Sequence, residues 1–244
     1  MNITIVNCFD TYEHRADLLF KYLTEAGHMV TVLTSDYQHI GKIKRTANKD
    51  RYLFFDTIPY YKNISLRRAC SHIQLSKDIF GYVEKNINTI NLLWVFVPPN
   101  SFVKAAANVK RKYDKVKLIF DLIDLWPESM PITSIKNIFP FTCWKNLRDK
   151  HLNSADYIVT ECNLYQSILK NNLNKMMVKT LYLARPFVKY IPQLDLPDKK
   201  IALCYLGSIN NIIDIDCIED IIKKCQKYKP VMLHIIGDGE NKSG

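Results

Sequence analysis

The chain has 244 residues, of which 48% are hydrophobic and 24% charged, with a formal net charge of +10. These fractions are typical of a folded globular protein and exclude a disordered or collagen-like chain. No run of about 18 apolar residues is present, and the first residues lack the basic and apolar regions of a signal peptide. The seven cysteines are scattered without a C-x-x-C pair. We therefore expect a cytoplasmic protein with reduced, buried thiols.

Short apolar runs alternate with longer segments of helical periodicity, the pattern of an α/β domain with a parallel sheet. A strand at 3–8, a helix at 15–26 and a strand at 28–34 form one βαβ unit. The other strands of this half are predicted at 52–56, 92–97, 116–121, 156–160 and 178–183, and its other helices at 66–88, 101–112, 143–153 and 161–171.

The stretch 185–200 contains three prolines and no clear period, which indicates a linker between domains. The alternation then restarts with a strand at 201–206, a helix at 214–227 and a strand at 231–236. One such unit is close to the lower size limit for an independent hydrophobic core. Three explanations stay open: the sequence is a fragment, the unit packs on the first domain, or a partner chain completes it. We favour the fragment.

Glycine is scarce, with seven residues in the chain, and three of them follow the strands of the second half: Gly207, Gly237 and Gly239. Backbone N–H groups in loops between a strand and a helix can face a phosphate group. A G-x-G pattern alone is a weak signal, and ordinary tight turns would also place glycine here. The sequence predicts either a phosphate-facing edge or plain turns.

The segment 121–129 (DLIDLWPES) places three carboxylates and an indole at the carboxyl end of a predicted buried strand. Its polar and aromatic residues are Asp121, Asp124, Trp126 and Glu128. A carboxylate here can accept hydrogen bonds from sugar hydroxyls or act as a base, and an indole offers a platform for a ring. The alternative is that Asp121 or Asp124 caps a turn and that Trp126 fills the core.

A second polar group follows the first strand, where Glu13, His14 and Arg15 open the predicted helix. A single histidine in such a loop is more often a surface or capping residue than a catalyst. The six histidines are dispersed, and no His, Cys or Asp cluster has the spacing of metal ligands. The sequence therefore predicts no metal site.

The positive charge is concentrated in residues 1–180, which hold 25 Lys and Arg against 16 Asp and Glu. Such a charge suits an anionic partner or a solvated surface. The basic runs lack the interleaved aromatics of single-strand binders, so we expect no nucleic-acid partner.

Residues 131–150 mix apolar side chains (Ile138, Phe139, Phe141, Trp144) with cations (Lys136, Lys145, Arg148, Lys150). This segment predicts either contact with an anionic lipid surface or a core-facing helix with a solvated basic side.

In five segments, the sequence resembles GT-B glycosyltransferases of family 4, in the bacterial polysaccharide branch. The segments occur in the family's order and are EAGHMVTVLT (25–34), DLIDLWPES (121–129), ADYIVTECNLYQSIL (155–169), YLGSI (205–209) and LHIIGDGE (233–240). The resemblance implies a GT-B-like α/β fold: a Rossmann-like acceptor-binding domain over 1–184, a linker over 185–200, and an incomplete nucleotide-sugar-binding domain over 201–244, truncated at its C-terminus.

The activity that the resemblance implies is transfer of a sugar from a UDP- or GDP-sugar, without a metal or other cofactor and with retained configuration. The acceptor would be a lipid-linked or saccharide molecule of capsule, exopolysaccharide or O-antigen assembly. The protein would then be peripheral to the inner face of the cell membrane.

The resemblance also suggests a role for each candidate residue. Asp121 and Asp124 would be catalytic, and Glu13, His14, Arg15, Trp126 and Glu128 would contact the acceptor. The donor side would be lined by Gly207, Ser208, Asn210, Gly237, Gly239 and Glu240.

Two departures from the family pattern concern the donor half. The family usually places Arg and Lys in the loop after the first glycine, but residues 208–211 read Ser-Ile-Asn-Asn. The acidic E-x7-E motif of the family is also missing. We therefore expect little sugar transfer by residues 1–244 alone. The alternative is a non-catalytic acceptor- or partner-binding subunit of a split glycosyltransferase, completed by a second chain. A nucleotide-sugar epimerase is a third possibility.

Overall fold

The structure is a computed structural model that describes residues 1–46, 48–130, 137–173, 177–185, 189, 199–207 and 213–237. The chain divides into two compact units, Met1–Arg185 and Pro186–Gly244. Almost all of the predicted linker at 185–200 lies outside the described residues.

The first unit is built on a parallel sheet, which confirms the predicted α/β class. Within the described residues the sheet has seven strands in the order β3-β2-β1-β4-β5-β6-β7, and each neighbouring pair is parallel. The strands are β1 (Asn2–Val6), β2 (Met29–Ser35), β3 (Tyr52–Phe55), β4 (Leu92–Val97), β5 (Lys117–Leu122), β6 (Tyr157–Thr160) and β7 (Val178–Thr180).

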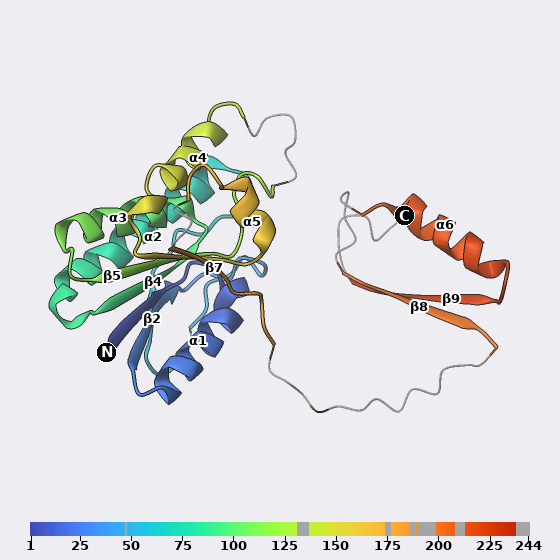
Figure 1. Cartoon of the computed structure of the whole chain (residues 1–244), viewed down its shortest axis with the longest axis horizontal. Helices are drawn as coiled ribbons and strands as arrows, with labels where there is room; N and C mark the ends of the chain where they lie inside the picture. Colours follow the sequence, from blue (N-terminus) through green and yellow to red (C-terminus); the bar gives the residue numbers. More distant parts are fainter. Residues whose placement is uncertain are drawn as a thin grey trace. The chain divides into compact units, whose positions relative to one another are not determined.

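Helices cover both faces of this sheet (Figure 1). They are α1 (Glu13–Glu25), α2 (Leu66–Lys85), α3 (Asn100–Lys112), α4 (Phe141–Asp149) and α5 (Asn163–Ile168). Strand side chains alternate between two cores because successive residues point to opposite faces. Val6 and Leu33 pack in the core under α2 and α3, whereas Ile5 and Val32 pack in the core under α1.

The cysteines correct one expectation. All seven are free, but Cys8 is the only buried one. Cys70, Cys143, Cys204 and Cys217 are exposed, and the other two are half-buried. Cys70 and Cys143 lie on helices and point away from the core, so the prediction of generally buried thiols was wrong.

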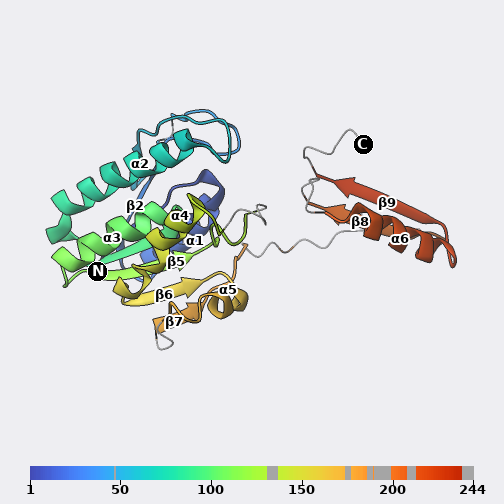
Figure 2. The same cartoon turned by 90° about the horizontal axis from the view of Figure 1, so that it is seen from above.

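The second unit consists of β8 (Ile201–Leu206), α6 (Ile215–Gln226) and β9 (Val231–Ile236). The two strands pair in parallel, from Ile201 opposite Val231 to Leu206 opposite Ile236. Helix α6 lies along one face of this pair (Figure 2), and the Asp214 side chain caps it by accepting from the Cys217 N–H at 2.9 Å. Among the described residues of both units, no helix has the length and hydropathy needed to cross a bilayer.

Candidate functional site

The carboxyl edge of the first sheet gathers the groups that can carry chemistry. All strands run in parallel, so the residues after β1, β5 and β6 meet there, together with the N-termini of α1, α2 and α4. The order of the strands reverses between β1 and β4. In open α/β sheets, ligands bind at this edge, beside the point of reversal.

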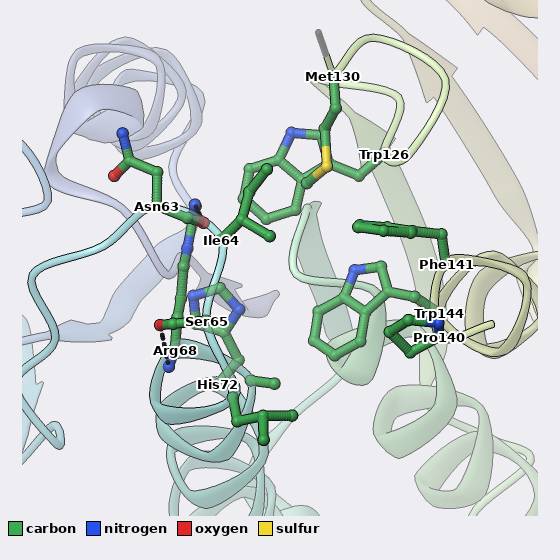
Figure 3. Close-up of a pocket in the computed structure, with 12 residues that line it drawn as sticks. Asn63, Ile64, Ser65, Arg68, His72, Trp126, Met130, Pro140, Phe141 and Trp144 are labelled. Atoms are coloured by element: carbon green, nitrogen blue, oxygen red, sulfur yellow. Dashed lines mark hydrogen bonds between the residues drawn. The ribbon is translucent and has the colours of Figure 1, made fainter. Parts of the chain in front are cut away.

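A pocket of about 430 Å³ lies between the first turn of α2, the start of α4 and the loop after β5. Most of its wall is apolar: Ile64, Leu66, Ala69, Trp126, Met130, Pro140, Phe141 and Trp144. Figure 3 shows Arg68 and His72 on α2 and Phe141 and Trp144 on α4 around the pocket, with Trp126 beside them. Its size is that of a small-molecule site.

Asp124 fixes the position of Trp126 in this wall. One carboxylate oxygen, Oδ2, accepts from the indole Nε1 of Trp126 at 2.7 Å. The other, Oδ1, accepts from the Leu125 N–H at 2.8 Å and from the Ser129 hydroxyl at 2.5 Å. The carboxylate of Asp124 therefore organises the whole loop, and Trp126 belongs both to the hydrophobic core and to the pocket.

Glu128 ties the same loop to α4. Its carboxylate forms a bidentate pair with Arg148, at 2.9 and 2.8 Å. Burial alone would raise the pKa of Glu128, but hydrogen bonds and charge from Arg148 hold this pKa below its usual range. Arg148 also donates to the Trp126 carbonyl oxygen at 2.7 Å and is fully buried. Sequence analysis left Arg148 on either a lipid-facing or a solvated basic surface, and both expectations are wrong for this residue because its guanidinium is used inside the fold.

Arg68 and His72 lie one turn apart on α2, and both are buried. Arg68 Nη1 donates to the Asn63 carbonyl oxygen at 2.5 Å, and the Tyr60 hydroxyl interacts with the guanidinium. Nε and Nη2 have no carboxylate partner within the described chain. The guanidinium lies 4.5 Å from the centre of the Trp126 ring. Neither ring nitrogen of His72 has a partner among the described residues, and burial holds the pKa of His72 well below its usual value. Sequence analysis missed both residues.

Asp121 and Arg15 form a closed ion pair beneath this edge. Arg15 donates from Nε and Nη2 to the two carboxylate oxygens, at 2.9 Å each, and the Trp94 indole donates to Asp121 at 2.9 Å. Burial raises the pKa of the Asp121 carboxyl, and the charge of Arg15 opposes that rise. Arg15 also reaches the carbonyl oxygen of Leu181 at 3.1 Å. The pair therefore joins α1, β5 and the end of the first unit.

Glu13 and His14 do not line the pocket in the described structure. Glu13 pairs with Arg45 at 2.5 Å and with Lys49 at 3.1 Å, on the opposite side of α1 from Arg15. The Nε2 atom of His14 is buried and makes no hydrogen bond within the described residues. The predicted role of both residues in acceptor binding stays a prediction.

Glu161 is a carboxylate that sequence analysis missed. It directly follows β6, and its N–H donates to the Leu122 carbonyl oxygen at 3.1 Å. Burial and the nearby charge of Asp124 raise the pKa of Glu161. Its place immediately after a predicted strand is the one feature of the amino-acid sequence that could have identified it. The carboxylates of Asp124 and Glu161 therefore lie close enough at this edge for their charges to interact.

The donor-side candidates belong to the second unit. The Gly207 N–H donates to the Ile236 carbonyl oxygen at 3.0 Å. A Cβ atom at Gly237 would lie only 1.8 Å from the Gly207 carbonyl oxygen, so the two strand ends require glycine there. Ser208, Asn210, Gly239 and Glu240 lie outside the described residues. Among the residues that are described, no group of three His, Cys, Asp or Glu could hold a metal ion.

The sequence matches no protein-family model and no curated protein. Solved structures do match over nearly the whole chain. The apo form of WaaB, a lipopolysaccharide outer core galactosyltransferase, is 14% identical with a TM-score of 0.57, over 99% of this chain and 62% of its own. A candidate UDP-N-acetylglucosamine 2-epimerase from Listeria monocytogenes is 11% identical with a TM-score of 0.52, over 96% and 62%.

The spinosyn rhamnosyltransferase SpnG, complexed with thymidine diphosphate, is 12% identical with a TM-score of 0.50, over 97% of this chain and 65% of its own. This chain thus spans less than two thirds of the length of each of these three proteins. At such low identity the likeness concerns the fold. The chain has the Rossmann-like α/β fold that these three proteins share.

Proposed function

We propose that this chain belongs to a glycosyltransferase that moves a sugar from a UDP- or GDP-sugar to a lipid-linked or saccharide acceptor. Capsule, exopolysaccharide or O-antigen assembly would be its setting. The observation that carries the proposal is the aromatic-walled pocket at the carboxyl edge, beside the reversal of strand order, on a fold shared with a galactosyltransferase and a rhamnosyltransferase.

The acceptor occupies the first unit in this proposal. Trp126 supplies a flat apolar wall, and Asp124 keeps that wall in place through the indole hydrogen bond. Glu161, with its raised pKa, is the carboxyl that can hold a proton beside Asp124. Asp121 supports this edge through Arg15 rather than through an open carboxylate oxygen.

The donor occupies the second unit. The segments at the ends of β8 and β9, with Gly207, Ser208, Asn210, Gly237, Gly239 and Glu240, would bind the diphosphate. The Gly207 N–H is already bonded to the Ile236 carbonyl oxygen, so the N–H groups of the residues that follow it would face the diphosphate. Backbone dipoles can stabilise the leaving diphosphate where no metal ion neutralises it.

Transfer is tested with protein produced from its natural reading frame, labelled UDP- and GDP-sugars, and lipid extracts of its source cells. Label should enter the lipid fraction. The Asp124→Asn variant should lower the rate by about a hundredfold, because Trp126 loses its charged anchor. Asp78→Asn, on exposed α2 surface, is the matched control and should leave the rate unchanged. Failure of every nucleotide sugar to label any acceptor would rule out the transferase.

The main alternative is a non-catalytic subunit that binds the acceptor and depends on a second chain for the donor. The observation that favours it is the sequence at 208–211, which reads Ser-Ile-Asn-Asn and lacks a cation for the diphosphate. Acceptor binding without transfer, restored by adding a partner, would support this alternative. Conversion of a nucleotide sugar without any acceptor would instead support an epimerase.

Peripheral binding to the inner face of the membrane is part of the proposal. Leu66 is 83% exposed and Phe139 is 77% exposed. Leu66 lines the pocket, and Phe139 precedes two residues that do so. The exposed cations Lys62 and Arg67 flank Leu66 along the chain. Apolar side chains beside cations suit an anionic lipid surface.

Sedimentation with liposomes tests the membrane contact. The protein should pellet with vesicles of anionic lipid at low salt and should remain in solution with neutral vesicles. The Leu66→Ser/Phe139→Ser variant should pellet less. The hypothesis fails if the wild-type protein does not bind anionic vesicles at low salt.

A further inference from the structure

Arg68 is a buried cation whose counter-charge the described fold does not supply. Its side chain is only 6% exposed, and none of the ion pairs among described residues includes it. A buried guanidinium with two unpaired nitrogens is costly unless an anion accepts from them. The aromatic faces of Phe9, Tyr60 and Trp126 contact the charge but cannot neutralise it.

His72 repeats the same pattern one helical turn later. Its ring is 1% exposed and stacks on Trp126 at 6.2 Å. A neutral imidazole has one donor and one acceptor nitrogen, and both are unpartnered in the described structure. Two adjacent, buried and unsatisfied polar side chains thus lie in the wall of a single pocket.

The remaining residues of the pocket wall indicate what chemical group a bound anion would carry. No carboxylate lines it within the described residues, so a cationic ligand would find no partner. Trp126, Phe141 and Trp144 offer an apolar surface beside the two polar side chains. Helix α2, which begins at Leu66, also directs the positive end of its dipole to the pocket. The wall therefore suits an anion joined to an apolar group.

We propose that this pocket binds a phosphate ester of an apolar group, with the phosphate on Arg68 and His72 and the apolar group against Trp126, Phe141 and Trp144. The phosphate oxygens accept from the free Arg68 nitrogens and from the donor nitrogen of His72. Only the identification of this ligand as the sugar acceptor rests on the proposed function; the binding itself does not.

Tryptophan fluorescence measures this binding directly, because two of the three tryptophans line the pocket. The probes are octyl phosphate, phenyl phosphate, octanol and inorganic phosphate. One of the two esters should bind at least about tenfold more tightly than both octanol and inorganic phosphate. Preference for octyl phosphate would identify a lipid phosphate, and preference for phenyl phosphate would identify a phosphate on a planar ring.

The Arg68→Gln variant should lose at least about tenfold in affinity for the preferred ester and nothing for octanol. Lys77→Gln is the matched control, since it removes an exposed charge from the same helix at a residue that does not line the pocket, and it should bind the ester normally. Equal loss in both variants, or affinity for octanol equal to that for the preferred ester, would overturn the proposal.

The comparison of probes on wild-type protein needs no variant, so the proposal stays testable if Arg68→Gln does not fold. If both esters bind no better than inorganic phosphate, the proposal is wrong. Sugar transfer can fail while the ester still binds, and the ester can fail to bind while transfer proceeds. The two proposals are therefore separable.

Discussion

Arg15 and Arg68 occupy the same position in two helices that pack on the first sheet, but their surroundings differ. Each is the third residue of its helix, α1 or α2. Each points to the carboxyl edge of the sheet and is nearly buried, at 7% and 6% exposure. Arg15 has a bidentate carboxylate partner in Asp121, whereas Arg68 has only neutral polar neighbours among the described residues, the Asn63 carbonyl oxygen and the Tyr60 hydroxyl.

The difference distinguishes a buried charge that stabilises the fold from a buried charge that is available to a ligand. A buried arginine whose nitrogens are all used holds elements together, as Arg15 joins α1 to β5. A buried arginine with free nitrogens lowers stability and gains its partner only when a ligand binds. Arg148, fully buried and paired with Glu128, belongs with Arg15.

Asp121→Asn should have the largest effect on stability, because it removes the counter-charge that distinguishes Arg15 from Arg68. The variant leaves Arg15 buried without a counter-charge and sets an amide NH2 group against its donors. We expect the free energy of unfolding to fall by about 3 to 5 kcal/mol, measured by urea denaturation of the whole chain.

The control for this variant is Asp56→Asn, because Asp56 is exposed and pairs with Lys44 at the surface. Its effect should be below about 1 kcal/mol. If Asp121→Asn costs no more than Asp56→Asn, the Arg15 pair is not structural and the comparison fails.

The dependence of stability on pH tests the buried environment of His72 and of its neighbour His39. Burial lowers the pKa of His72 well below its usual value and the pKa of His39 to about 4. Below pH 6.5 the unfolded chain therefore binds protons at these histidines before the folded chain does. Stability is full above pH 6.5 and falls as the pH falls toward the folded pKa values.

His72→Phe isolates the contribution of His72. The groups facing His72 are the cation Arg68 and His39, within an aromatic shell of Phe9, Tyr60, Trp126 and Trp144. Between pH 7 and 5 the wild-type protein should lose about 2 kcal/mol more than the variant. Carboxylates titrate equally in both proteins. Parallel curves in urea denaturation at the two pH values would contradict a neutral, buried His72.

Much of the fold could be predicted because local patterns define it. The predicted strands at 92–97, 201–206 and 231–236 coincide with β4, β8 and β9, since each is a short apolar run bounded by charged residues, proline or glycine. Helix α4 begins at Phe141, two residues before the predicted start, because Pro140 can occupy the position before the first helical turn.

The pocket could be predicted only in part. The segment 121–129 was identified, and both Phe141 and Trp144 were noted for a lipid surface. Arg68 lay in a basic run that had no distinguishing feature. Its lack of a counter-charge depends on which residues fold around it, and Trp126 is 58 positions away along the chain. The sequence shows that Arg68 and His72 share a helical face, but burial and missing partners are tertiary properties.

Arg68→Met should have the smallest effect on the free energy of unfolding, and its sign should be opposite to that of Asp121→Asn. Methionine fills similar space without a charge, so the unliganded protein should gain stability, on the order of 1 kcal/mol in free energy of unfolding. The lost contact of the guanidinium with Trp126 reduces this gain. Arg15→Met should instead destabilise, because Asp121 loses its counter-charge. Urea denaturation of both variants gives the two signs, with Arg67→Met as the exposed control. A loss of stability in Arg68→Met as large as that in Arg15→Met would make Arg68 a structural residue and remove its distinction from Arg15.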